Sequence, residues 1–407
     1  MSQGDRFASL RIPDYRKLWW GGMFVFLATQ SQQIARGWLA FELTGSNTAL
    51  GGVVFGFGVS SLIAIPAGGV LADRVPKRTI LLVAQGAIML AGLAIAVAIA
   101  TDTVAYWMLV AAGAVQGAGM SLLGPARLAM TADLVDRESL TNAIFLSNGS
   151  IQMTRVIGPA IAGALIGVAT IGVGGVYFIG AGLSTLSLFF TVGLPRGEPT
   201  RRSHRSPIGD MADGVAYVRR RPELQRLLVV SLLVVMLGFP HVTFLPAMIE
   251  EIFELDAWAL GLLTTSAAMG AVGSSFLLAN SPRDRLPSLQ ARAGVLFGLT
   301  LLGFAVSPWF WLAVAVMLLV GATSSAFQAL NNSLVLTIAD VEYHGRVQSL
   351  IMLSFSGFGL AALPMGTLAD AYGIRETMAG MALLVLASMT ISFAWHRRIA
   401  RPEPVAL

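Results

Sequence analysis

The chain has 407 residues, of which 55% are hydrophobic and only 12% are charged. Soluble domains carry about 25% charged residues, so this composition, with a mean hydropathy of +0.73, indicates a polytopic membrane protein. The chain has no cysteine, which excludes disulfides, thiolate metal sites and thiol catalysis. Residues 1–17 are polar and basic and lack the apolar core of a signal peptide, so we expect a cytoplasmic tail there.

Apolar windows long enough to cross a membrane, about 20 residues each, follow one another along the chain. They lie at 18–41, 49–72, 79–100, 104–126, 141–168, 171–193, 225–248, 258–279, 289–307, 309–336, 347–369 and 376–395. The predicted fold is therefore an all-α membrane protein with twelve transmembrane helices, six on each side of a charged interval. The division between the ninth and tenth windows is the least distinct, because only Ser307, Pro308 and Trp309 separate them.

The positions of the charges support this count. With a cytoplasmic N-terminus, the predicted outside loops contain a single base, Arg375, and several acids. Nearly all other bases fall on the inside, including Arg226 and Arg292 at the inner ends of their windows, and only Arg36 and Arg155 of the 27 remain for the membrane interior. By the positive-inside rule, both ends are cytoplasmic. The net charge of +5 therefore reflects topology, and we expect no nucleic-acid partner.

The charged interval predicts the domain boundary. We expect an N-terminal bundle at 1–195, a cytoplasmic linker at 196–222 and a C-terminal bundle with a short tail at 223–407. The first part of the linker is polar and contains proline, which is typical of a flexible segment. Apolar residues then recur at helical spacing from Ile208 to Val218, which predicts a short amphipathic helix. Its bases would suit anionic lipid headgroups, or they serve only as topogenic charge.

Short sequences recur in the two halves. Ala49-Leu50-Gly51 opens the second span and Ala259-Leu260-Gly261 opens the eighth; Asp133 precedes the fifth span and Asp340 precedes the eleventh. These matches agree with two six-helix repeats in parallel orientation.

Polar residues inside spans mark candidate cavity walls, since lipid offers them no partners. In the first span, Gln33 and Arg36 lie on one helical face with Thr29; they line a cavity, or Arg36 reaches the outer surface and the others join helices. In the fifth span, a second stripe lies near the helix midpoint and contains Asn148, Gln152 and Arg155. Arg155 has no acid at similar depth, so it binds helix carbonyls, polar side chains or an anionic substrate.

Two further features interrupt the spans. Gly158 and Pro159 predict a bend in the fifth span, because proline frees a backbone carbonyl and small residues permit close contact. Gly238, Pro240 and His241 interrupt the seventh span. His241 is a candidate titrating group, although a lone membrane histidine is more often a hydrogen-bonded structural residue.

The loop between the second and third spans carries a family motif. It reads Gly69-Val-Leu-Ala-Asp73-Arg74-Val-Pro76-Lys77-Arg78-Thr-Ile-Leu81 and resembles the major facilitator superfamily signature G-x-L-A-D-R-x-G-R-K-x-x-L, with Pro76 in place of a glycine. The segment around Gly158 and Pro159 resembles the antiporter motif of superfamily exporters. The segments at 37–46, 125–142 and 214–222 extend the resemblance. Together these residues look like the enterobactin-exporter-like branch, which includes siderophore and drug exporters.

The resemblance implies two six-helix bundles related by pseudo-two-fold symmetry that alternate around a central substrate site. The expected protein is then a monomeric transporter of the cell membrane. Its inner face would carry a conformational loop made of Gly69, Asp73, Arg74, Lys77 and Arg78. The expected substrate is a small organic molecule, anionic if Arg36 and Arg155 bind it; the expected surroundings are membrane lipids, and no cofactor is expected. Protons are a candidate coupling ion, through His241, Glu42 or Asp73, and facilitated diffusion is the alternative.

Other functions remain open at this point. The closest alternative to an exporter is an importer of the same fold, because the number of helices does not set the direction of transport. An integral-membrane enzyme would need a catalytic cluster, but the four histidines are scattered. A channel would need a repeated selectivity element, and none is visible.

Overall fold

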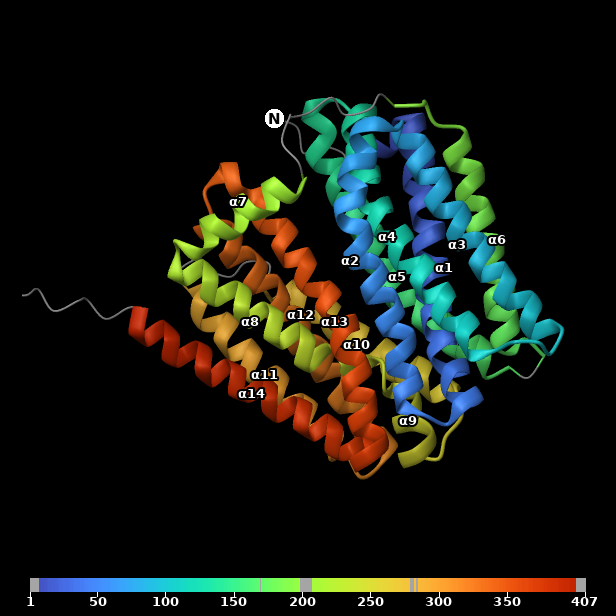
Figure 1. Ribbon diagram of the computed structural model, residues 1–407, viewed down its shortest axis with the longest axis vertical. Coiled ribbons are helices and arrows are strands. Elements are labelled where there is room, and N and C mark those ends of the chain that lie inside the picture. The colour runs from blue at the N-terminus through green and yellow to red at the C-terminus, as the bar shows by residue number, and fades with distance from the viewer. Residues whose placement is uncertain (1–6, 169, 198–206, 279–281, 283–284, 400–407) are drawn as a thin grey trace, which may run out of the picture. The chain divides into compact units, whose positions relative to one another are not determined.

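The computed structural model describes residues 7–168, 170–197, 207–278, 282 and 285–399, and leaves undescribed some side chains within helices, among them those at positions 66–70, 72 and 73. The first half contains α1 (Pro13–Thr44), α2 (Asn47–Arg74), α3 (Lys77–Ala100), α4 (Tyr106–Leu134), α5 (Arg137–Ile166) and α6 (Gly172–Val192). The second half contains α7 (Pro207–Arg219), α8 (Pro222–Gly238), α9 (Leu245–Ala247), α10 (Trp258–Leu278), α11 (Leu286–Ala305), α12 (Phe310–Ile338), α13 (His344–Tyr372) and α14 (Ile374–Ile399). Figure 1 shows these helices coloured along the chain.

Eleven of the twelve predicted membrane windows each coincide with one helix, the seventh falls on the broken run from α8 to η3, and α7 lies where the amphipathic linker helix is expected. Among the described residues, nine helices or helix runs are long and apolar enough to cross a membrane. The helices α1, α5 and α13 are not among them, and α1 and α5 are the two whose polar side chains suggested a cavity. The all-α, multi-span fold is thus confirmed.

Local sequence explains where helices begin and end. Pro13 and Pro222 occupy the first turns of α1 and α8, where the missing N–H costs nothing. Helix α1 ends at Gly45, whose φ of 58° is left-handed and whose N–H donates to the Phe41 carbonyl. Pro76 precedes α3 with φ −53°, so the fixed proline geometry suits the two-residue connection between α2 and α3.

The contacts divide the chain into two compact units. Unit 1 contains residues 1–45, 52–204 and 255–265, and unit 2 contains residues 46–51, 205–254 and 266–407. The first five residues of α2 and the first eight residues of α10 thus belong to different units from the remainder of the same helices. These are the two segments that carry the repeated Ala-Leu-Gly sequence.

In unit 1, α1 packs along α5 and α6, and α3 packs along α4 and α6 (Figure 1). A buried cluster of aliphatic residues from α1, α3 and α4 includes Val25, Leu81 and Met130. Helices α2 and α4 approach closely at Gly117, because a Cβ there would collide with the Phe57 carbonyl. Close packing of this kind supplies the van der Waals attraction that holds membrane helices together.

In unit 2, α8 packs against α13 and α14, and α11 packs against α12 and α14. Gly321 of α12 lies against the backbone of Ala267 in α10, so this pair repeats the close approach of α2 and α4. The seventh predicted span is broken, as expected: α8 ends at Gly238, a 3₁₀ turn η2 (Phe239–Val242) follows, and a π-helical segment η3 (Met248–Ile252) comes after α9. The linker helix α7 docks on α13.

Candidate substrate site

The polar stripe of α5 lies on the surface of unit 1. Asn148, Gln152 and Arg155 are all exposed, although they lie in the middle of a 30-residue helix. No hydrogen bond or ion pair joins Arg155 to another described residue. Because an uncompensated cation at membrane depth is costly, this stripe is suited to an aqueous surface that receives an anion.

The polar residues of α1 separate. Gln33 is exposed, like the α5 stripe, whereas Arg36 is only 5% exposed and Thr29 is 1% exposed. The Thr29 carbonyl accepts a hydrogen bond from Gln116 Nε2 at 3.0 Å, which ties α1 to α4. The structure therefore brings Gln33 to the surface but turns Arg36 into unit 1, and the two do not share an exposed face.

Arg36 lies among buried polar groups of unit 1. Its Nε is 3.7 Å from the position that a Cβ on Gly113 would occupy, and its guanidinium interacts electrostatically with Tyr177. Neither Arg36 Nε nor the Tyr177 hydroxyl has a hydrogen-bond partner among the described residues. Arg36 thus adds positive charge beneath the surface instead of forming part of it.

Gly158 and Pro159 fasten the stripe to α1. Both are buried, and a Cβ on Gly158 would lie 2.7 Å from the Cβ of Gln30. Ser31 Oγ donates to the Gly158 carbonyl at 3.2 Å. Glycine at position 158 therefore allows α1 and α5 to touch, and the packed crossing holds the exposed stripe in place.

The basic residues that follow α2 contact the ends of other helices in unit 1. Lys77 Nζ lies 2.6 Å from Asp133 Oδ2 at the end of α4, and Arg78 Nη1 donates to the Leu194 carbonyl at 2.8 Å after α6. Arg74 is exposed. The surroundings of Gly69 and the side chain of Asp73 lie outside the described part of the chain. The bases thus join the start of α3 to the ends of α4 and α6.

Asp133 and Asp340, which occupy matching places in the two repeats, both form ion pairs. Asp340 Oδ2 lies 2.6 Å from Arg221 Nη2, just before α8. The repeated acid therefore binds a base in each unit, but the base comes from a different helix.

His241 is enclosed in unit 2. It is 3% exposed, and its Nδ1 lies 2.7 Å from the Gly238 carbonyl, which can only accept, so this nitrogen is the donor. This bond spans the turn where α8 ends. The arrangement favours the structural alternative for His241.

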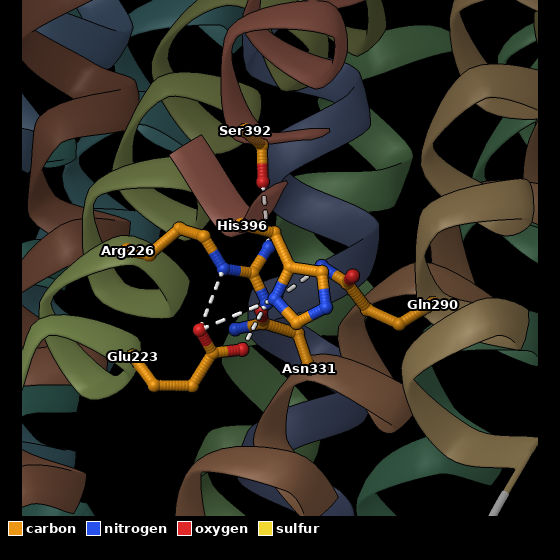
Figure 2. A network of polar contacts seen from close by, with 6 residues as sticks. All are labelled: Glu223, Arg226, Gln290, Asn331, Ser392 and His396. Atoms are coloured by element: carbon orange, nitrogen blue, oxygen red, sulfur yellow. Dashed lines mark hydrogen bonds and ion pairs between the residues drawn. The ribbon is translucent and has the colours of Figure 1, made fainter. Parts of the chain in front are cut away.

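A partly buried ionic network in unit 2 has no counterpart among the sequence predictions (Figure 2). Glu223 accepts hydrogen bonds from Arg226 Nε at 3.2 Å and from Nη2 at 2.5 Å, and His396 Nδ1 lies 3.4 Å from the same carboxylate. Arg226 Nη1 donates to Ser392 Oγ at 2.7 Å. The spacing of Glu223 and Arg226, three residues apart, was the available signal. The network joins the start of α8 to the end of α14.

Charge is therefore distributed differently in the two units. The buried arginine of unit 2, Arg226, has a carboxylate partner, whereas Arg36, Arg127 and Arg155 of unit 1 have none among the described residues. The described residues also contain no group of three His, Cys, Asp or Glu placed to hold a metal ion. Among the described residues, unit 1 therefore carries positive charge that no carboxylate compensates.

Known proteins resemble this chain over most of its length. A family model described as transmembrane secretion effector matches residues 4–402. The chain is 23% identical over 381 residues to the staphyloferrin A transporter of Staphylococcus aureus, covering 92% of this chain and 94% of that protein. It is 26% identical over 308 residues to the enterobactin exporter EntS of Escherichia coli, covering 75% of this chain and 71% of that protein.

Solved structures share the fold. One is a bacterial homolog of the human lysosomal transporter Spinster, with a TM-score of 0.77 and 14% identity over 97% of this chain and 99% of that chain. Another is the nucleoside transporter NupG, with a TM-score of 0.68 and 14% identity over 96% of this chain and all of that chain.

Proposed function

Since this chain belongs to the transmembrane secretion effector family of the major facilitator superfamily, and is accordingly a multi-pass membrane transporter and not an enzyme, we propose that it exports a small organic anion by alternating access. Both termini then lie in the cytoplasm, and the site of unit 1 is reached first from that side. The protein acts as a monomer, surrounded by membrane lipids.

The exposed stripe of α5 carries this proposal. Arg155 supplies a permanent positive charge, because a guanidinium is not deprotonated in proteins. Gln152 and Asn148 follow it at helical spacing and offer both donors and acceptors. Gln33 of α1 is exposed as well. A carboxylate or a phenolate-bearing ligand would satisfy Arg155, and its carbonyl and hydroxyl groups would suit the amides.

Two relatives support the substrate class, and one of them supports the direction. Their names specify a staphyloferrin A transporter and an enterobactin exporter, so a siderophore-like substrate moving outward is the reading we favour. An importer of the same fold is the second candidate. In the cycle we propose, the Lys77–Asp133 pair and Arg78 stabilise one conformation of the inner face.

Transport into inside-out membrane vesicles tests the proposal, with enterobactin and staphyloferrin A as probes and with or without a proton gradient. Export predicts accumulation inside these vesicles, and dependence on the gradient would identify the proton as coupling ion. Accumulation without any gradient, only down the probe's own concentration difference, would indicate facilitated diffusion. Uptake confined to right-side-out vesicles would establish import instead.

The Arg155→Ala variant tests the site. Hydrogen bonds to a charged group contribute about 1.5–3 kcal/mol, so transport at low probe concentration should fall roughly tenfold to a hundredfold. The matched control is Arg137→Ala, because Arg137 is also exposed and begins the same helix. Normal transport by Arg155→Ala in correctly folded protein would contradict the assignment of the α5 stripe.

A further inference from the structure

The first turn of α2 is held by a carboxylate from a helix more than 300 residues away. Asp370, near the end of α13, accepts hydrogen bonds from Ser46 Oγ at 2.7 Å and from the backbone N–H groups of Asn47 at 2.7 Å and Thr48 at 2.9 Å. All four residues belong to unit 2. We call this set of contacts the α2–α13 latch.

The latch uses the chemistry of a helix N-terminus. The first N–H groups of a helix have no partner within it, and negative charge is favoured there. Ser46 supplies the usual cap from the same turn, since its Oγ accepts from the Ala49 N–H at 3.4 Å, and Asp370 adds an acceptor from another helix for two further N–H groups. The contribution of Asp370 therefore stabilises α2 only while α2 and α13 stay together.

A second hydrogen bond and close backbone packing also hold the first turn of α2 against its neighbours. Asn47 Nδ2 donates to Glu251 Oε1 at 3.2 Å, which adds η3 to the set. A Cβ on Gly51 would collide with the Ala362 carbonyl, and a Cβ on Gly366 would collide with the Asn47 carbonyl. The backbones of α2 and α13 thus touch directly, and this brings Asp370 within reach of the N–H groups.

Two features of the latch would allow its contacts to break. Asp370 is exposed although Asn47 is buried, so water is available to replace its hydrogen bonds. Residues 46–51 have their contacts in unit 2, but α2 continues from Gly52 onward in unit 1. A movement of α2 with unit 1 would therefore break the latch.

We propose that Asp370 is a positioning residue of the transport cycle, which holds the start of α2 on α13 in one conformation and releases it in the other. The inference rests on the alternating-access mechanism proposed above. It does not depend on which molecule is transported. By the charge pattern of the loops, the latch lies on the outer side of the membrane.

A disulfide lock tests the proposal, and the natural absence of cysteine removes any background. In the double variant Ser46→Cys/Asp370→Cys, the two side chains that meet in the latch can be joined by an oxidant. We expect the oxidised protein to lose transport of enterobactin and staphyloferrin A in vesicles, and reduction to restore it. Transport that continues in the fully joined protein would overturn the proposal, because a static contact tolerates a covalent bond.

A second measurement does not need transport. Ala49 is 8% exposed in the first turn of α2, so Ala49→Cys should react slowly with a membrane-impermeant maleimide added from outside. Adding Asp370→Asn should raise the labelling rate roughly tenfold, because the neutral amide is a weaker acceptor. The matched control Asp102→Asn removes an exposed acid from the turn between α3 and α4 and should leave the rate unchanged.

The two measurements separate the latch from the proposed function. Faster labelling in Asp370→Asn, with no probe transported by any form, would retain the latch and reject the proposed substrates. Unchanged labelling, with transport that still depends on Arg155, would reject the latch and retain the function.

Discussion

The ion pair of Glu223 and Arg226 provides a quantitative test of buried charge in unit 2. Glu223→Gln keeps the size of the side chain and removes its charge. Arg226 is 7% exposed and would retain only the Ser392 hydroxyl as a strong partner. Breaking a fully buried pair costs about 3–5 kcal/mol. Because Glu223 is 26% exposed and water can screen the remaining charge, we expect a loss of about 1–3 kcal/mol.

Thermal unfolding in detergent, followed by the fluorescence of the eight tryptophans, measures this loss. The matched control is Asp14→Asn. Asp14 and Lys17 have the same three-residue spacing at the start of α1 and a distance of 2.8 Å, but they are 42% and 41% exposed. An exposed pair of this kind contributes about 0–1 kcal/mol, so this variant should unfold nearly like the parent.

The double variant Glu223→Leu/Arg226→Leu completes the test. Replacing both partners of a buried pair by apolar residues is often neutral, so the double variant should be more stable than Glu223→Gln. Equal destabilisation by Glu223→Gln and Asp14→Asn would refute the reasoning. A double variant less stable than Glu223→Gln would refute it as well.

Two further predictions concern packing and unpaired charge in unit 1. A Cβ on Gly163 would collide with the backbone of Gly261, so Gly163→Ala should lower the thermal stability by about 1–3 kcal/mol. The control Gly182→Ala should leave it unchanged, because a Cβ there meets nothing within 4 Å. Equal effects of the two variants would show that α5 and α10 can separate freely. Arg127 is 6% exposed, none of its three side-chain nitrogens has a hydrogen-bond partner among the residues that the structure describes, and it lies 5.4 Å from the ring of Phe26. Arg127→Met should therefore raise the unfolding free energy by about 1–4 kcal/mol, and a fall in the same unfolding assay would reveal a partner for the guanidinium.

The fold was predictable because membrane spans are set by local composition. A continuous apolar run predicted a span at 79–100, and α3 occupies Lys77–Ala100. Even the least distinct boundary was correct: α11 ends at Ala305 and α12 begins at Phe310. The interruption at Gly238 and Pro240 was also visible, since both residues disfavour a regular helix.

Side-chain partners were less predictable, because a helical period cannot tell one buried face from another. Spacing placed Gln33 and Arg36 on one face of α1, yet Arg36 is buried and Gln33 is exposed. Spacing placed Asn148, Gln152 and Arg155 together, and all three are exposed. The difference arises because the neighbours of α1 on each side are decided by tertiary packing, which composition does not encode.

Contacts between distant segments could not be predicted at all. Arg226 and Ser392 are 166 residues apart, and Ser46 and Asp370 are 324 apart. Each is an ordinary residue at a helix end when the sequence is considered alone. Only the fold shows that these ends meet.

The docking of α7 also limits how far the chain can stretch between the halves. Tyr217 stacks on Tyr343 with ring centroids 3.8 Å apart, and Arg221 lies over the Tyr217 ring, so α7 is fixed to unit 2. On the other side, the Arg196 carbonyl accepts the Arg78 N–H at 3.3 Å in unit 1. From Gly197 to Pro207 the chain makes ten steps, which span at most about 35 Å when fully extended. The linker therefore sets an upper limit on the separation of its two anchor points. In the alternating-access cycle proposed above, deleting residues from the linker should restrict the movement of the two bundles before it affects the stability of either one.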